Sequence, residues 1–159
     1  MGARRKAREC ALMILYGMEN SGHTAETALD RFRASFATGE ALDPLPVYAS
    51  EDAAREPTSF MAADGETWSY ATKLVYGVSS AKPELDELIR GISVHWRLDR
   101  MASVDRNVLR LAAFEMTKFA DSVPRRVAIN EAIDLAKSYG TAESGAFVNG
   151  ILDRIGTRD

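Results

Sequence analysis

The chain has 159 residues, of which 46% are hydrophobic, so it can bury a core as one domain. Its 27% of charged residues is ordinary for a globular protein and argues against a disordered chain. The lone cysteine, Cys10, excludes a disulfide framework and suits a reducing cytoplasm, where we expect the protein to act. No apolar run approaches the roughly 18 residues that span a bilayer, so no membrane partner is expected.

The net charge of −3 is distributed unevenly along the chain. Residues 1–18 carry four bases and one acid, whereas residues 19–66 carry ten acids and three bases. An acidic protein with one basic end is not a general binder of polyanions. If it meets nucleic acid, we expect it to do so through a local patch.

Hydrophobic periodicity predicts helices along most of the chain. Apolar residues at the three- and four-residue spacing of a helical stripe predict a first helix over 7–18 and a second over 24–36. Residues 37–58 lack this periodicity and contain five acids and three prolines, so we expect them to form a flexible acidic insertion.

The second part of the chain continues the helical pattern. A third helix is predicted over 59–79, and Pro83 suits the first turn of a fourth. A fifth helix is expected over 103–118, a sixth from Pro124 to Tyr139, and a seventh from Thr141 onward. No run alternates with period two for long enough to form a strand. The predicted fold class is therefore all-α, with about seven helices.

The first helix carries two different faces. The core stripe lies on one side, and Arg5, Leu12 and Tyr16 lie on the opposite side, with Arg8 beside them. An exposed pair of Leu12 and Tyr16 would form a small patch for a protein partner. The alternative is that a neighbouring helix covers the pair.

Four bases, Arg4, Arg5, Lys6 and Arg8, gather where this helix begins. Cations in the first helical turn oppose the helix dipole, at about 0.3–1 kcal/mol each at low salt. Binding of RNA or another polyanion would explain their position. The alternative, a solvated helix face, is equally compatible with the charge pattern alone.

Four blocks of sequence resemble the NusB family of transcription antitermination proteins. Each block alone is a helical pattern of modest specificity, but together, in this order and spacing, they are a strong signal that covers most of the chain. The blocks are Arg4 to Glu9 followed by Ala11, Leu15 and Tyr16; Trp96 to Met101 with Val104 to Arg106 and Leu109 to Ala112; Val123-Pro124 with Val127 to Ala132 and Leu135 to Lys137; and Phe147 to Gly150 with Leu152-Asp153.

The resemblance implies a non-enzymatic RNA adaptor made of two packed helical halves, a single NusB-like RNA-binding domain over residues 1–159. The family binds the boxA element of ribosomal RNA leader transcripts together with NusE, a small-subunit ribosomal protein, and supports read-through by RNA polymerase in an antitermination complex. Carried over by motif, the RNA-binding residues are Arg4, Arg5, Lys6, Arg8, Glu143, Ser144 and Phe147, and the residues facing NusE are Leu12, Tyr16 and Glu19.

Phe147 and Ala146 qualify this assignment. Phe147 would stack on an RNA base, although its periodicity with Val148, Leu152 and Ile155 is equally that of a core phenylalanine. Ala146 stands where some relatives have a base, which removes a potential phosphate contact.

Other classes of function have weaker support. The sequence has no nucleophile elbow, no phosphate-binding glycine loop and no His or Cys at metal-ligand spacing, so we expect no enzyme activity, cofactor or metal. A homodimeric protein–protein module that never binds RNA is the main alternative. NusB-like domains also precede some RNA methyltransferases, but a chain that ends at Asp159 leaves no room for a methyl-donor domain.

Overall fold

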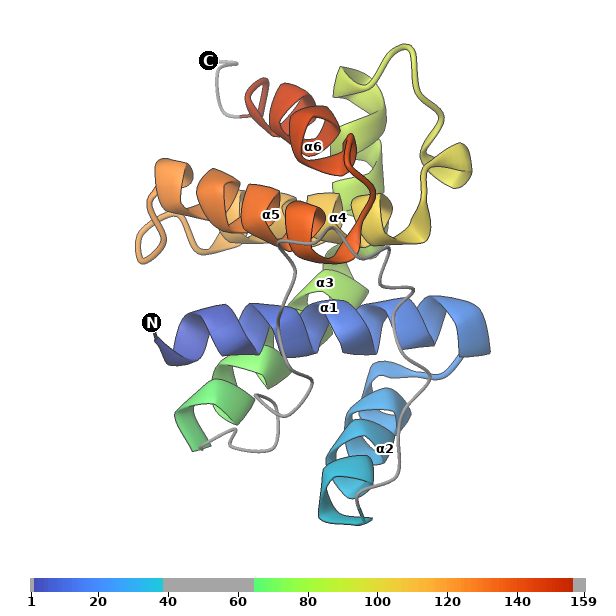
Figure 1. The fold of residues 1–159 in the computed structure, drawn as a ribbon, viewed down its shortest axis with the longest axis vertical. Helices are drawn as coiled ribbons and strands as arrows, with labels where there is room; N and C mark the ends of the chain where they lie inside the picture. Colours follow the sequence, from blue (N-terminus) through green and yellow to red (C-terminus); the bar gives the residue numbers. More distant parts are fainter. Residues whose placement is uncertain (1, 39–64, 156–159) are drawn as a thin grey trace.

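The computed structural model describes residues 2–38 and 65–155. Within these ranges the structure is all-α, which confirms the predicted fold class (Figure 1). The insertion predicted over 37–58 lies, from residue 39 on, outside the described residues. The helices are α1 (Ala3–Ser21), α2 (Ala25–Thr38), α3 (Gly65–Ile92), α4 (Ser103–Lys118), α5 (Arg125–Tyr139) and α6 (Ser144–Leu152), and a short 3-10 turn, η2, covers Leu98–Arg100.

Helix α3 corrects one prediction, because the expected third and fourth helices form a single helix of 28 residues. Pro83 lies inside it rather than at its start. A proline there removes one backbone hydrogen bond and crowds the carbonyl four residues earlier. Apolar residues on both sides of Pro83, Val78 and Leu85 among them, are buried in one core, and this packing holds the helix together across the proline.

The helices form two groups with α1 between them (Figure 1). On one side lie α2 and the first turns of α3, and on the other lie α4, α5 and α6. Helix α3 runs from the first group into the second, α4 packs on α3 and α5, and α6 packs mainly on α5. This arrangement confirms the two packed helical halves that the resemblance implied.

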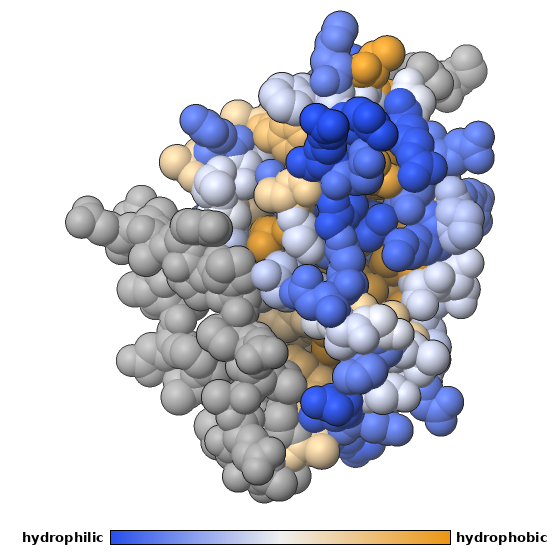
Figure 2. Space-filling model, turned by 90° about the vertical axis from the view of Figure 1, so that its right-hand side faces the viewer, coloured by the Kyte–Doolittle hydropathy of each residue, from blue (hydrophilic) through white to orange (hydrophobic). Residues whose placement is uncertain are grey.

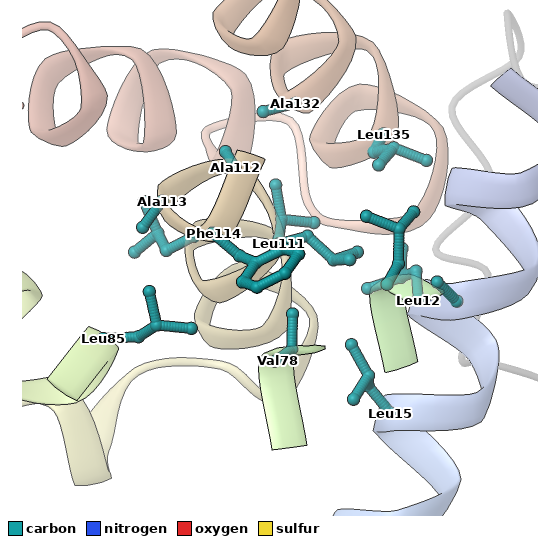
Figure 3. Close-up of a cluster of buried hydrophobic side chains, with 14 of the residues drawn as sticks. Leu12, Leu15, Val78, Leu85, Leu111, Ala112, Ala113, Phe114, Ala132 and Leu135 are labelled. Atoms are coloured by element: carbon teal, nitrogen blue, oxygen red, sulfur yellow. The ribbon is translucent and has the colours of Figure 1, made fainter. Parts of the chain in front are cut away.

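The core lies where α1, α3, α4 and α5 meet (Figure 3). Leu12 and Leu15 of α1 point into it, toward side chains of the other three helices. Because α1 has neighbours on two sides, its buried surface extends well beyond one apolar stripe. No helix in the described part of the chain is both long enough and apolar enough to cross a membrane.

Candidate functional site

The basic start of α1 is anchored by a buried ion pair. The Arg8 guanidinium donates two hydrogen bonds to the Glu115 carboxylate, of 2.7 and 2.8 Å, and both side chains are almost fully buried. The Tyr70 hydroxyl donates a third hydrogen bond to Glu115, of 2.5 Å. Burial opposes the charge of Arg8, but the hydrogen bonds with Glu115 outweigh this and raise its pKa. Arg8 is therefore a structural cation, and the prediction that it lies in the accessible basic cluster is wrong.

Arg5 has a divided role. Its guanidinium bonds the Glu131 carboxylate at 3.0 and 3.3 Å and the Asp134 carboxylate at 2.5 Å, both on α5. The hydrogen bond with Glu131 is the main reason why its pKa is raised. About a quarter of the side chain remains exposed. Arg5 therefore joins α1 to α5 and also contributes positive charge at the surface.

Arg4 and Lys6 complete the basic end of α1. Arg4 is exposed, donates a 3.3 Å hydrogen bond to the Ser122 carbonyl and lies 5.3 Å above the centre of the Tyr70 ring. Lys6 is partly buried and lies near Cys10, one turn further along the helix. We call Arg4, Arg5 and Lys6 the basic turn. No acidic residue lies in the first turn of α1, and the Glu131 and Asp134 carboxylates of α5 balance part of its positive charge.

The three predicted residues of α6 have different environments. Glu143 is exposed at the N-terminus of the helix. Ser144 is buried, and its hydroxyl accepts a 2.9 Å hydrogen bond from the Thr141 backbone, so it forms the turn into α6 and is inaccessible to RNA. Phe147 is partly buried and contacts Trp96 edge to face, with ring centres 5.6 Å apart. Phe147 thus belongs to the edge of the core and to the surface at once.

The structure also changes the predicted partner-binding face of α1. Leu12 is fully buried, so the alternative of a covering helix holds for it and it cannot contact a partner. Glu19 is engaged within the chain, since its carboxylate accepts a 2.7 Å hydrogen bond from Asn107 and pairs with Arg106 on α4. Tyr16 is partly exposed and is the one of the three predicted residues that lines a surface pocket.

That pocket lies between the middle of α1 and the ends of three other helices. Its lining combines Tyr16 with Asp105 at the start of α4, Tyr139 at the end of α5, and Ser144 at the start of α6. One carboxylate oxygen of Asp105, Oδ1, is buried and has no hydrogen-bond partner among the described residues. Burial raises the pKa of Asp105, although a hydrogen bond with Ser144 partly opposes this. A buried acceptor without a donor is unfavourable in the isolated protein.

The basic turn and Phe147 lie at different ends of α5. The basic turn contacts Ser122, just before α5, through Arg4, and Glu131 and Asp134 in the middle of that helix through Arg5. The start of α6 contacts the end of α5, where Gly145 lies against Lys137. Figure 1 likewise shows the N-terminus of α1 near the start of α5, with α6 beginning at the opposite end. A ligand that contacts both must run along α5, whose 15 residues are about 22 Å long at 1.5 Å per residue.

Comparison with known proteins identifies the family. The NusB family model matches residues 5–157. This chain belongs to the NusB family. It is 44% identical over 155 residues to the transcription antitermination protein NusB of Myxococcus xanthus, covering 98% of this chain and 95% of that protein. It is 40% identical to the corresponding protein of Bdellovibrio bacteriovorus, covering 97% and 95% of the two chains.

Solved NusB structures agree with this fold. T. maritima NusB superimposes with a TM-score of 0.72 at 32% identity, over 95% of this chain and 88% of that one. A structure of the antitermination factors NusB and NusE in complex with double-stranded RNA gives a TM-score of 0.68 at 25% identity, over 96% and 95%. The resemblance inferred from the sequence blocks is confirmed.

Two residues beside the candidate site were not predicted from the sequence. Tyr70 supports Arg4 and Arg8 from α3, at 5.3 and 5.8 Å from ring centre to guanidinium carbon. Trp96 lies in the loop between α3 and α4 and contacts Phe147. In the sequence, Trp96 is only one residue of a block that resembles the family, and Tyr70 lies in no motif. No group of three metal-ligand side chains lies together in residues 2–38 and 65–155.

Proposed function

We propose that this protein is an RNA-binding transcription antitermination factor that binds boxA RNA of ribosomal RNA leader transcripts together with NusE. The observation that carries the proposal is the basic turn, held in place by the buried Arg8–Glu115 pair. Cations at a helix start oppose the helix dipole, and binding of RNA phosphates would offset that cost.

In this proposal the basic turn binds RNA phosphates and Phe147 stacks on a base at the other end of α5. Arg4 and Lys6 make the phosphate contacts together with the exposed part of Arg5. Linear RNA is bound in this way elsewhere, by cations along the backbone and aromatic rings against unstacked bases. Glu143 borders the path near Phe147, where its charge limits how closely phosphate approaches.

NusE binds, in the same proposal, over the pocket lined by Tyr16 and Asp105. The buried Oδ1 atom of Asp105 has no donor among the described residues, and a donor from a partner would satisfy it. Tyr16 adds a partly exposed aromatic ring of the kind that is common at protein interfaces. The NusB–NusE complex with RNA among the similar structures supports the choice of partner.

The protein acts by assembly rather than by catalysis, in the cytoplasm, as part of an RNA polymerase antitermination complex. It holds RNA on one surface and NusE on another, so that each strengthens the retention of the other. No chemical step is required of any residue in this role. A homodimer formed through α1 without RNA is the competing model.

The test measures binding of a fluorescent boxA RNA by anisotropy, with and without NusE. A double variant, Arg4→Ala with Lys6→Ala, should weaken binding at least tenfold while the far-ultraviolet circular dichroism stays unchanged. The matched control, Arg31→Ala with Lys82→Ala, removes two exposed cations elsewhere and should change affinity less than twofold. Equal affinities for the two double variants, or a dimer that RNA does not alter, would contradict the proposal.

A further inference from the structure

The loop between α3 and α4 exposes two large hydrophobic side chains. Trp96 is 61% and Val94 is 76% exposed, whereas most large hydrophobic residues in the described part of the chain are buried. Tryptophan carries the largest apolar surface of any side chain, and leaving it in water forgoes the free energy of burial. A tryptophan exposed to this extent is therefore a candidate contact residue rather than part of the core.

Phe147 fixes the position of the Trp96 ring. The two ring planes are 85° apart and their centres are 5.6 Å apart, which is a favoured edge-to-face arrangement. Phe147 itself packs on the core from α6. The indole is thus held against a rigid element, while more than half of its surface stays open to a ligand.

Two arginines adjoin the indole. Arg90, in the last turn of α3, and Arg97 line a shallow surface pocket with Trp96, and Asp99 contributes the one acidic side chain of that lining. Arg97 pairs with Asp99 at 3.3 Å, but the two side chains are 71% and 66% exposed. An ion pair so open to water is weak and can exchange for a phosphate. The side of the molecule that carries this loop is predominantly hydrophilic, with small hydrophobic areas between the polar residues (Figure 2).

We propose that Trp96, supported by Phe147, is a stacking platform for an unpaired base of the bound RNA, with Arg90 and Arg97 contacting the adjacent phosphates. The inference rests on the proposed RNA-binding function and extends it, because it adds Trp96, Arg90 and Arg97 to the end of the RNA path where Phe147 lies. Aromatic rings flanked by guanidinium groups are the composition typical of single-strand binding surfaces. A protein-docking surface would be expected to have a broader apolar centre than two exposed side chains beside two arginines.

The first experiment compares Trp96→Ala, Trp96→Phe and a matched control, Tyr76→Ala, in anisotropy titrations with single-stranded boxA RNA. Tyr76 is also a large exposed side chain, at 43%, and it lies outside the Trp96 pocket. We expect Trp96→Ala to weaken binding about 5- to 100-fold, the range that base stacking spans. Trp96→Phe should retain most of the affinity, and the control should bind within twofold of the unaltered chain.

The second experiment observes the indole directly. The chain has two tryptophans, so Trp68→Phe leaves Trp96 as the sole tryptophan. The proposal predicts that its fluorescence is quenched in proportion to bound RNA. Absence of RNA binding by the unaltered chain would refute the proposed function itself. Three results would overturn this inference alone. They are RNA binding that leaves Trp96 fluorescence unchanged, RNA binding that Trp96→Ala does not weaken, and a Trp96→Ala variant that loses only NusE binding.

Discussion

The buried Arg8–Glu115 pair makes a quantitative prediction about stability. Replacing Glu115 by Gln removes the negative charge and keeps the shape of the side chain. Arg8, only 5% exposed, then loses its hydrogen-bonded counter-ion and keeps only the Glu131 carboxylate, 3.9 Å away. A guanidinium stays protonated in proteins, so Arg8 cannot escape the penalty by losing a proton. Breaking one side of a buried pair costs about 3–5 kcal/mol.

Urea unfolding followed by circular dichroism at neutral pH measures this change. With a slope of about 2 kcal/mol per molar urea, the midpoint of Glu115→Gln should fall by about 1.5–2.5 M. The matched control is Glu84→Gln, which breaks the exposed pair with Lys118 and should change stability by about 0–1 kcal/mol. These two substitutions are chemically identical and differ only in the burial of the pair.

A double variant, Arg8→Met with Glu115→Leu, tests whether the loss of stability comes from the uncompensated charge. Removing both charges together avoids an uncompensated ion, so the double variant should exceed Glu115→Gln in stability by at least about 2 kcal/mol. Because the pair anchors the basic turn but Arg8 itself is inaccessible, the double variant should bind boxA RNA more tightly than Arg4→Ala with Lys6→Ala does. A loss below about 1 kcal/mol for Glu115→Gln, or strict additivity of the single substitutions, would refute the reasoning.

Three further predictions concern single residues. Asp105→Asn should stabilise the isolated chain at neutral pH, because burial raises the pKa of Asp105 and so disfavours its charged form. In urea titrations the gain should vanish below pH 3.8, the ordinary pKa of the carboxyl, where Asp105 is neutral in both the folded and the unfolded chain. The same substitution should weaken NusE binding, because it removes the charged acceptor proposed for a donor of NusE. Cys10, whose pKa burial raises to about 12, should resist alkylation at pH 8 until the chain unfolds, as a thiol-reagent time course would reveal. Gly77→Ala should lower the free energy of unfolding by about 1–3 kcal/mol, because its new methyl group would lie 2.1 Å from the Phe114 ring; a melting temperature equal to that of the unaltered chain would contradict this.

Local sequence signals predicted the bounds of some helices well. The predicted bounds of α4 agree with the structure, and α5 differs by one residue at its start. Pro83 misled the prediction, because a proline favours a helix start when only its own backbone is considered. The buried residues on either side of it keep α3 continuous, and that packing is a property of the tertiary structure.

The site could be predicted only in part. Motif resemblance predicts that the basic turn and Phe147 contact RNA, but a helical wheel of α1 alone could not show that helices cover two of its sides. Arg8 and Leu12 were therefore expected at the surface and are buried. The partner of Arg8 lies 107 residues away, and Trp96 reaches Phe147 from a loop on a different element. Contacts of this kind have no signature in a local pattern.

The salt dependence of RNA binding tests the central claim most directly. Each phosphate contact with single-stranded RNA contributes about −0.7 to the slope of log affinity against log salt concentration. Contacts from Arg4, Lys6 and part of Arg5 should give a slope of about −2 from the basic turn, with any contact at Arg90 or Arg97 adding to it. Arg4→Ala with Lys6→Ala should reduce the magnitude of the slope by about 1.4. An unchanged slope in this variant would contradict the assignment of the basic turn as the phosphate-binding surface.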